Sequence, residues 1–376
     1  MALLSSSSPR LLLRSFPALA RPPRAAYHDY IRILTPGGGT VRLPLNNPHF
    51  VGTASSRGER RQQEDFYAYA GLSLDPAELA LSFKKMHGID WDPTSLPPAL
   101  ARQVMFVGIY DGHGGSTVSQ FLRQELHGLF ENVNQSRFRK LGGYFRRFTG
   151  GALSSWVDKM LSEEREAKEC GATASIVLLK SLDNSGFFQA SQVALTVAHV
   201  GDTRVLLTST EAGRVTPMTE NHHADARVES IRLRRMMGGL TTDSFGEIRW
   251  MGVLANTRCL GDLKFKPYGV TPEPEVRSMV LEGPKWSHIT LISDGVSSVV
   301  SDEEVSDLAR GALSPKHAAE RILSYAEDMG SDDNMTAIVV PLAGWGKITG
   351  PDRTKELRDY RVKGMQGSER QRGRWM

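Results

Sequence analysis

The chain has 376 residues, of which 40% are hydrophobic, and its formal net charge is +4. This length and composition allow one large globular domain or two ordinary ones with a substantial core, and so mild a charge argues against nucleic acid as the main partner. The two cysteines, Cys170 and Cys259, exclude a disulfide framework and a pair of zinc knuckles and fit a reducing compartment. No stretch approaches the roughly 20 apolar residues of a membrane span.

Residues 1–28 have the composition of a mitochondrial transit peptide. Leucines and a serine run accompany several arginines, and no acidic residue occurs before Asp29; the arginines are Arg10, Arg14, Arg21 and Arg24. The apolar stretch 11–13 is too short for a secretory signal. We therefore predict a cleavable targeting segment and a place in the mitochondrial matrix, with a disordered basic tail of the same composition as the alternative.

Short apolar, β-branched runs that end in aspartate and glycine recur along the chain. The runs 104–110, 193–200 and 289–293 predict buried strands, and they are followed by Asp111-Gly112, Gly201-Asp202 and Asp294-Gly295. Further strands are expected at 175–180 and 336–341. A carboxylate at the end of a buried strand raises the free energy of the folded state unless a cation compensates its charge.

Helical periodicity lies between these runs, with Val118, Leu122, Leu126 and Leu129 on one face of the first helix. Further helices are expected near 152–168, 226–237, 302–310 and 316–327. Because helices and strands do not alternate regularly, an antiparallel α+β fold is favoured over a doubly wound parallel sheet.

Three other segments are set apart by their composition. Residues 71–103, with two proline-containing pairs, are expected to form a surface insertion between two strands that contacts substrate. Residues 137–147 form a basic patch, interpreted first as a solvated loop. Residues 347–376 are expected to be a basic, mostly disordered tail.

The acidic residues near the strand ends are the candidate site. Asp-Gly taken alone is above all a turn dipeptide. Several carboxylates gathered at strand ends, however, would repel one another unless cations lay among them. Oxygen ligands select hard ions such as Mg²⁺ or Mn²⁺.

The acidic pairs belong to ordered motifs that resemble the PPM, or type 2C, family of metal-dependent protein serine/threonine phosphatases. The motifs are Arg60-x-x-x-Glu64-Asp65, Tyr110-Asp111-Gly112-His113-Gly114-Gly115, Gly171-Ala172-Thr173-Ala174, Val200-Gly201-Asp202-Thr203-Arg204, Thr257-Arg258-Cys259-Leu260-Gly261-Asp262, Ser293-Asp294-Gly295 and Asp333-Asn334-Met335-Thr336. The resemblance implies a phosphatase domain over residues 45–346. It also implies a four-layer αββα sandwich, with two antiparallel sheets flanked by helices and a metal centre at one edge.

The resemblance also implies a role for each site residue. Two divalent cations, Mg²⁺ or Mn²⁺, would be held so that Asp111 bridges both, Asp294 and Asp333 complete the first site, and Glu64 and the Gly112 carbonyl hold the second. Asp65, Asn334 and Thr173 would lie behind these ligands and orient them. Arg60 would bind the phosphate, and His113 would protonate the leaving serine or threonine oxygen. Water activated between the two cations would attack phosphorus.

One departure from the family pattern concerns a weak third metal site. Many members combine the aspartate of the Gly-Asp motif, here Asp202, with an acid four residues after the Ser-Asp-Gly aspartate. That position is Ser298 in this chain, so a third cation is expected to bind loosely or not at all.

The resemblance indicates phosphoproteins as substrates, and residues 220–262 resemble the family's flap, where members differ in substrate choice. Matrix phosphoproteins such as the 2-oxo-acid dehydrogenase complexes are candidates by analogy with mitochondrial members. The chain is expected to be a monomer.

Two alternatives are weighed against this interpretation. A pseudophosphatase could lose any metal ligand without penalty, and all the implied ligands are present. A nucleic-acid-binding protein built on patch 137–147 and the tail would need a recognition helix or stacking motif, and none is visible.

Overall fold

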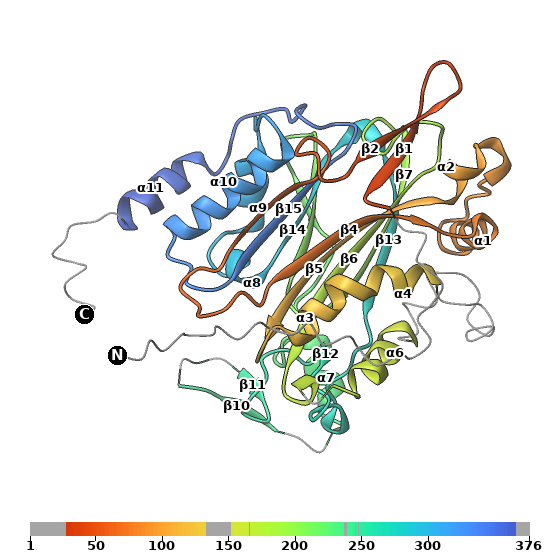
Figure 1. Ribbon diagram of the computed structural model, residues 1–376. Coiled ribbons are helices and arrows are strands. Elements are labelled where there is room, and N and C mark those ends of the chain that lie inside the picture. The colour runs from red at the N-terminus through yellow and green to blue at the C-terminus, as the bar shows by residue number, and fades with distance from the viewer. Residues whose placement is uncertain are drawn as a thin grey trace, which may run out of the picture.

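The structure, a computed structural model, describes residues 28–132, 152–164, 166–236, 239–244, 246 and 248–365. Two antiparallel β-sheets pack face to face, with helices on both outer faces (Figure 1). This arrangement confirms the predicted αββα sandwich. The expected transit peptide, apart from its last residue, and the basic patch 137–147 lie outside the described residues.

The first sheet has the strand order β13-β7-β6-β5-β4, and the short β12 pairs with the start of β6 on the edge opposite β5. All its pairs are antiparallel. Its strands are β4 (Phe66–Ser73), β5 (Gln103–His113), β6 (Gly171–Ser181), β7 (Gln192–Val200), β12 (Leu260–Gly261) and β13 (Glu275–Glu282).

The second sheet has the order β3-β15-β14-β8-β9, and all its pairs are antiparallel as well. Its strands are β3 (Gly52–Ser56), β8 (Arg204–Ser209), β9 (Val215–Pro217), β14 (Trp286–Ile292) and β15 (Met335–Pro341). The strands expected near 104–110, 175–180, 193–200, 289–293 and 336–341 are therefore all present.

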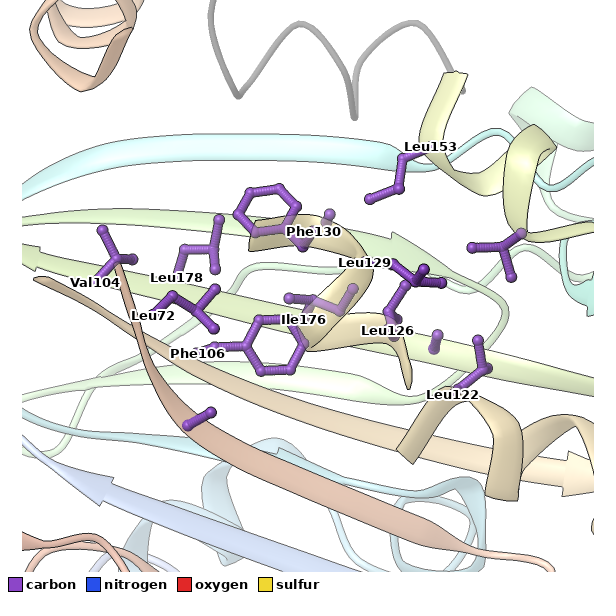
Figure 2. Close-up of a cluster of buried hydrophobic side chains, with 14 of the residues drawn as sticks. Leu72, Val104, Phe106, Leu122, Leu126, Leu129, Phe130, Leu153, Ile176 and Leu178 are labelled. Atoms are coloured by element: carbon purple, nitrogen blue, oxygen red, sulfur yellow. The ribbon is translucent and has the colours of Figure 1, made fainter. Parts of the chain in front are cut away.

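Alternating side chains on the central strands divide the hydrophobic core into layers. On β5, Met105, Val107 and Ile109 face the space between the two sheets, whereas Val104 and Phe106 face the helices on the outer side of the first sheet. Figure 2 shows this outer layer, in which Leu122, Leu126 and Leu129 cover Phe106 and Ile176. The period-two pattern of the strands thus fixes which face each sheet presents to the helices.

The helical run after β5 follows the predicted apolar stripe. It consists of α3 (Thr117–Phe121), a π-helical turn (Leu122–Leu126) and α4 (His127–Asn132). Beside it lies α6 (Ala152–Leu161), which ends earlier than the expected 168 and is followed by a 3₁₀ turn, η4 (Glu166–Lys168).

Helices α9 (Asp302–Ala309) and α10 (Pro315–Asp328) cover the second sheet. Their starts follow from capping, because Ser301 and Glu304 form a capping box on α9, and Ser314 caps α10 with Pro315 in its first turn. The short α8 (Asp294–Ser297) joins β14 to this layer.

The segment between β7 and β13 contains the predicted flap. It holds α7 (Arg227–Leu233), the strands β10 (Leu240–Thr242) and β11 (Ile248–Trp250), and the 3₁₀ turn η5 (Lys266–Tyr268). Helix α7 is shorter than the predicted 226–237, and Met237 and Gly238 lie outside the described residues.

The insertion 71–103 is helical and lies away from the acidic strand ends. It contains α1 (Pro76–His87), η1 (Pro93–Ser95) and α2 (Pro98–Arg102) between β4 and β5. Residue 103 begins β5 and Asp111 lies near its other end, about 27 Å away at the rise of a strand. The register of β5 therefore places this insertion at the opposite end of the sheet from Asp111, and its contact with substrate stays a prediction.

The chain ends differ from the expected boundaries. A hairpin of β1 (Tyr30–Leu34) and β2 (Thr40–Pro44) precedes the expected domain start at 45. Part of the tail expected to be disordered forms α11 (Lys355–Met365), whose Arg361 binds the buried carboxylate of Glu304. The tail prediction failed here because ion pairs hold this helix, and apolar periodicity does not reveal them. No helix in the described part of the chain is long and apolar enough to cross a membrane.

Candidate metal centre

Three carboxylates from distant parts of the sequence meet at one edge of the sandwich. Asp111 lies near the end of β5, Asp202 follows β7, and Asp294 begins α8 directly after β14. One carboxylate oxygen from each residue lies within 4.8 Å of the other two. The structure therefore brings together two residues predicted for the main site and the one predicted for a weaker third site.

The electrostatics of this cluster show how unfavourable it is without a cation. Burial, followed by the charges of Asp294, Asp65 and Asp202, raises the pKa of Asp111 well above its usual value. Burial and the neighbouring Asp202 raise the pKa of Asp294 to about 7. Burial also raises the pKa of Asp65 to about 6. These shifts mean that the ionised carboxylates lack compensating positive charge.

The cluster fits a hard divalent cation. Oδ2 of Asp111 and Oδ1 of Asp202 are buried and have no hydrogen-bond partner among the described residues. Unpartnered buried oxygens are costly in a folded protein. A site that offers only oxygen donors and several negative charges suits Mg²⁺ or Mn²⁺ better than a soft metal.

The loop with Glu64 approaches the cluster from the side of β5. The Gly112 backbone N–H donates to the Glu64 carbonyl at 3.2 Å, and the Ser119 hydroxyl donates to the same carbonyl at 2.7 Å. A β-carbon at Gly112 would lie 2.7 Å from that carbonyl oxygen, so the close approach depends on glycine. In the part of the chain that the structure describes, the Glu64 and Asp333 carboxylates do not belong to the tight group of three.

Arg60 and Asp333, which have separate predicted roles, form an ion pair with each other. Nη2 of Arg60 lies 2.7 Å from Oδ2 of Asp333, with side-chain exposures of 57% and 32%. The guanidinium therefore lies at the rim of the cluster, accessible to an anion from solvent.

Asp65 directly precedes β4, Thr173 lies in β6 and Asn334 directly precedes β15. Asn334 binds the loop of Glu64 through both ends of its amide: Oδ1 accepts the Glu64 backbone N–H at 2.7 Å, and Nδ2 donates to the carbonyls of Arg57 and Gln62 at 2.8 and 3.0 Å. Asp65 is buried. Thr173 pairs with Asp111 across β5 and β6, and its buried hydroxyl has no hydrogen-bond partner among the described residues.

His113 contacts a carboxylate that the sequence did not single out. Its Nε2 lies 2.6 Å from Oδ2 of Asp262. Burial lowers the pKa of His113, but the hydrogen bond and charge of Asp262 outweigh it and raise the pKa above its usual value. Asp262 belongs to the motif that ends in Gly261-Asp262, and that position was the only available signal for it.

Asp202 also has an unforeseen partner in His223. Nε2 of His223 lies 3.0 Å from Oδ2 of Asp202. Burial would raise the pKa of Asp202, but the hydrogen bond and charge of His223 lower it below its usual value. Ser298 lies in the turn after Asp294, and its hydroxyl is directed to the Gly295 carbonyl at 3.5 Å. A histidine therefore approaches Asp202, and the position that bears an acid in many family members has none here.

Comparison with known proteins gives a consistent result. Residues 83–335 match the family model described as Protein phosphatase 2C. The chain is 31% identical over 368 residues to protein phosphatase 2C homolog 4 of Schizosaccharomyces pombe, with 88% of this chain and 91% of that protein covered. It is 28% identical to "Protein phosphatase 1K, mitochondrial" of Xenopus laevis, over 81% of this chain and 71% of that protein.

The fold is also similar to that of solved structures. A serine-threonine phosphatase 2C from Toxoplasma gondii aligns with a TM-score of 0.57 at 18% identity, covering 84% of this chain and 99% of that one. At this identity the match shows the fold alone.

Proposed function

The chain belongs to the protein phosphatase 2C family and is a metal-dependent serine/threonine phosphatase, and from this premise we propose that it hydrolyses phosphoserine and phosphothreonine in mitochondrial phosphoproteins. The observation that carries the proposal is the meeting of Asp111, Asp202 and Asp294 within 4.8 Å at one edge of the sandwich. Because two of their buried oxygens have no hydrogen-bond partner among the described residues, the cluster is suited to binding cations rather than to packing.

In this proposal, Asp111 is shared between two divalent cations, Mg²⁺ or Mn²⁺. Asp294 and Asp333 complete the first site, and Glu64 with the Gly112 carbonyl completes the second. The two bound cations would supply the nucleophile, a hydroxide bridging them near neutral pH, for attack on phosphorus. Asp65, Asn334 and Thr173 keep the liganding groups in place from behind.

Arg60 and His113 act on the substrate itself. Arg60 exchanges its exposed contact with Asp333 for two phosphate oxygens, which its planar guanidinium can bind together. His113 donates a proton to the serine or threonine oxygen as the bond to phosphorus breaks. The alkoxide of serine or threonine is a strong base, so this proton is needed for departure.

A third cation is proposed to bind weakly. Asp202 is its natural ligand, but His223 lies 3.0 Å from that carboxylate, and a protonated imidazole there competes with a cation. The absence of an acid at Ser298 removes a second ligand.

The place and substrates of the enzyme are proposed from its N-terminus and one relative. The transit-peptide composition of residues 1–28, together with the relative named "Protein phosphatase 1K, mitochondrial", supports a matrix enzyme. Its proposed catalytic domain spans 45–346, and the proposed state is a monomer. The 2-oxo-acid dehydrogenase complexes are candidate substrates. Import of a reporter fused to residues 1–30 tests the location, and a cytosolic distribution of that reporter would contradict it.

Hydrolysis of a phosphothreonine peptide by the chain lacking residues 1–28 tests the function. We expect turnover with Mn²⁺ or Mg²⁺, none with chelator, and a loss of at least about 100-fold in Asp294→Asn, because one ligand charge is removed. Turnover that persists in chelator would contradict the metal mechanism. A folded chain that is inactive with every metal would instead support the pseudophosphatase alternative.

A further inference from the structure

The imidazole of His113 is held from one side by the carboxylate of Asp262. The two residues are 149 positions apart, and Nε2 of His113 lies 2.6 Å from Oδ2 of Asp262. The Asp262 side chain is 1% exposed, whereas that of His113 is 35% exposed. Because an ionised carboxylate can only accept hydrogen bonds, Nε2 must be the donor. Nδ1 has no hydrogen-bond partner in the described ranges, so it is the ring nitrogen left for a substrate.

The position of Asp262 is fixed by its backbone and by a second donor. Its φ of 48° lies in the left-handed region, which non-glycine residues rarely adopt unless the surroundings impose it. The backbone N–H of Asp262 donates to the Cys170 carbonyl at 2.8 Å. The buried Cys259 thiol donates to the same Oδ2 at 3.1 Å. The carboxylate is therefore held before any substrate arrives.

The strand between the two residues is shaped to let them meet. Gly171 at the start of β6 pairs with His113 on β5 and with Gly261 on β12. A β-carbon on Gly171 would collide with Oδ2 of Asp262 and lie 2.5 Å from Nε2 of His113. The ion pair therefore crosses β6 at a residue without a side chain. This contact gives a role to Gly171 and to Asp262, two motif residues to which the resemblance assigned none.

We propose that Asp262 is the positioning residue of the proton donor: it holds Nε2–H of His113 and thereby directs Nδ1–H toward the leaving oxygen of the phosphoester. The inference rests on the proposed function. As water oxygen forms its bond to phosphorus, the bond from phosphorus to the serine or threonine oxygen breaks and its electron pair stays on that oxygen. The oxygen takes the proton from Nδ1, which yields the alcohol and inorganic phosphate. The Nε2 proton remains on His113 throughout, hydrogen-bonded to Asp262.

The leaving group distinguishes this role from a structural one. The oxygen of phosphothreonine needs a proton to depart, but the weakly basic phenolate of p-nitrophenyl phosphate does not. With the full chain and Mn²⁺, we expect Asp262→Asn to lower kcat for a phosphothreonine peptide by about 100-fold and for p-nitrophenyl phosphate by less than about threefold, with little change in KM. His113→Ala should show the same losses of kcat on the two substrates as Asp262→Asn. The double variant should lose no more kcat than either single variant, because the two residues act as a unit.

Asp158→Asn is the matched control. Asp158 is a buried carboxylate whose Oδ1 accepts the Gly261 backbone N–H at 2.9 Å, so it supports the same segment and has no contact with His113. Its replacement should affect both substrates equally. If Asp262→Asn fails to fold, Cys259→Ala is the second variant, because it removes one donor to the Asp262 carboxylate. It should lower turnover of the phosphothreonine peptide by about threefold and leave that of p-nitrophenyl phosphate unchanged. Equal losses on both substrates in Asp262→Asn or in Cys259→Ala would overturn the proposal.

A spectroscopic readout separates this inference from the proposed function. In histidine ¹⁵N–¹H correlation spectra of the metal-free chain, assigned with His113→Gln, His113 should show a hydrogen-bonded Nε2–H that disappears in Asp262→Asn. If the Nε2–H signal disappears as expected but the wild-type chain hydrolyses neither substrate, the catalytic part of the proposal and the proposed function are both overturned. An Nε2 signal unchanged by Asp262→Asn would overturn the positioning role itself.

Discussion

Asn334 and Glu64, 270 residues apart, are joined by a hydrogen bond of 2.7 Å from the Glu64 backbone N–H to the Asn334 side chain. The same amide donates to the carbonyls of Arg57 and Gln62. One buried side chain directly before β15 therefore holds the loop that carries both a proposed metal ligand and the proposed phosphate-binding arginine.

Replacement of this amide should loosen the loop without removing a ligand. We expect Asn334→Ala to lower the free energy of unfolding by about 1–3 kcal/mol, because buried groups lose their partners. It should also raise the Mn²⁺ concentration needed for half-maximal turnover. Urea denaturation and a Mn²⁺ titration of activity measure the two effects. An unchanged metal requirement in a destabilised variant would limit Asn334 to a role in folding.

Neutralising one acid of the cluster should stabilise the metal-free chain. The pKa of Asp294 is raised by burial and by Asp202 to about 7, above the value near 4 expected for an unfolded aspartate. Asp294 therefore makes its full contribution to the free energy of unfolding below about pH 4, where it is protonated. This contribution is lost as the pH rises through 7. With chelator, Asp294→Asn should exceed the wild type in Tm by roughly 2–5 °C at pH 8 and by much less at pH 5.

The control for this prediction is the same pair of proteins in Mn²⁺. Bound cations compensate the charge of Asp294, so the advantage of asparagine should vanish or reverse at pH 8. Histidines whose pKa values burial lowers, such as His199 and His288, affect both proteins alike and cancel in the difference. A Tm difference independent of pH would show that charge repulsion is not its source.

Arg60 should matter for phosphate binding and hardly at all for stability. Its contact with Asp333 is solvent-exposed, and exposed ion pairs contribute about 0–1 kcal/mol. We expect Arg60→Ala to raise KM for a phosphothreonine peptide about tenfold or more while Tm changes little. Arg60→Lys should recover only part of the loss, because an ammonium cannot bind two phosphate oxygens with a planar fork. Full recovery by lysine would reduce the role of Arg60 to charge alone.

Arg361 should stabilise the fold through its contact with α9. Its Nη1 lies 2.8 and 2.7 Å from the two oxygens of Glu304, whose side chain is 1% exposed. Removal of the guanidinium leaves a buried carboxylate without its main cation, so Arg361→Ala should cost about 2 kcal/mol in urea denaturation. Arg214→Ala, which breaks an exposed pair with Glu211, is the control and should cost less than about 0.5 kcal/mol. Equal costs would contradict this account of α11.

The aspartates that follow the apolar runs were predictable as strand-end residues, because an apolar run that ends in aspartate indicates a buried strand with a charge at its end. The motif order then located Asp111 and Asp294 together before any geometry was known. The contacts of Asp262 and His223 were not predictable from spacing, because the two residues lie at opposite ends of the flap and meet His113 and Asp202 only in the folded chain. Helix α11 escaped prediction because its docking depends on arginines, which a hydrophobic pattern does not reveal.

The register of β5 decides where the insertion 71–103 lies relative to the acidic cluster. Proline pairs and sequence position indicate a loop between two strands, but only strand direction decides at which end of the sheet that loop lies. Because the pairing of β4 with β5 starts at Phe66 opposite Tyr110 and ends at Ser73 opposite Gln103, the insertion leaves the sheet far from Asp111.

The measurement that tests the central claim most directly is a Mn²⁺ titration of the wild type and Asp111→Asn, in which bound metal per chain and phosphothreonine hydrolysis are followed on the same samples. The account predicts that wild-type turnover rises as the second ion binds, and that Asp111→Asn loses both tight binding and turnover. Turnover without bound metal, or an Asp111→Asn chain that binds two ions tightly and remains active, would contradict it.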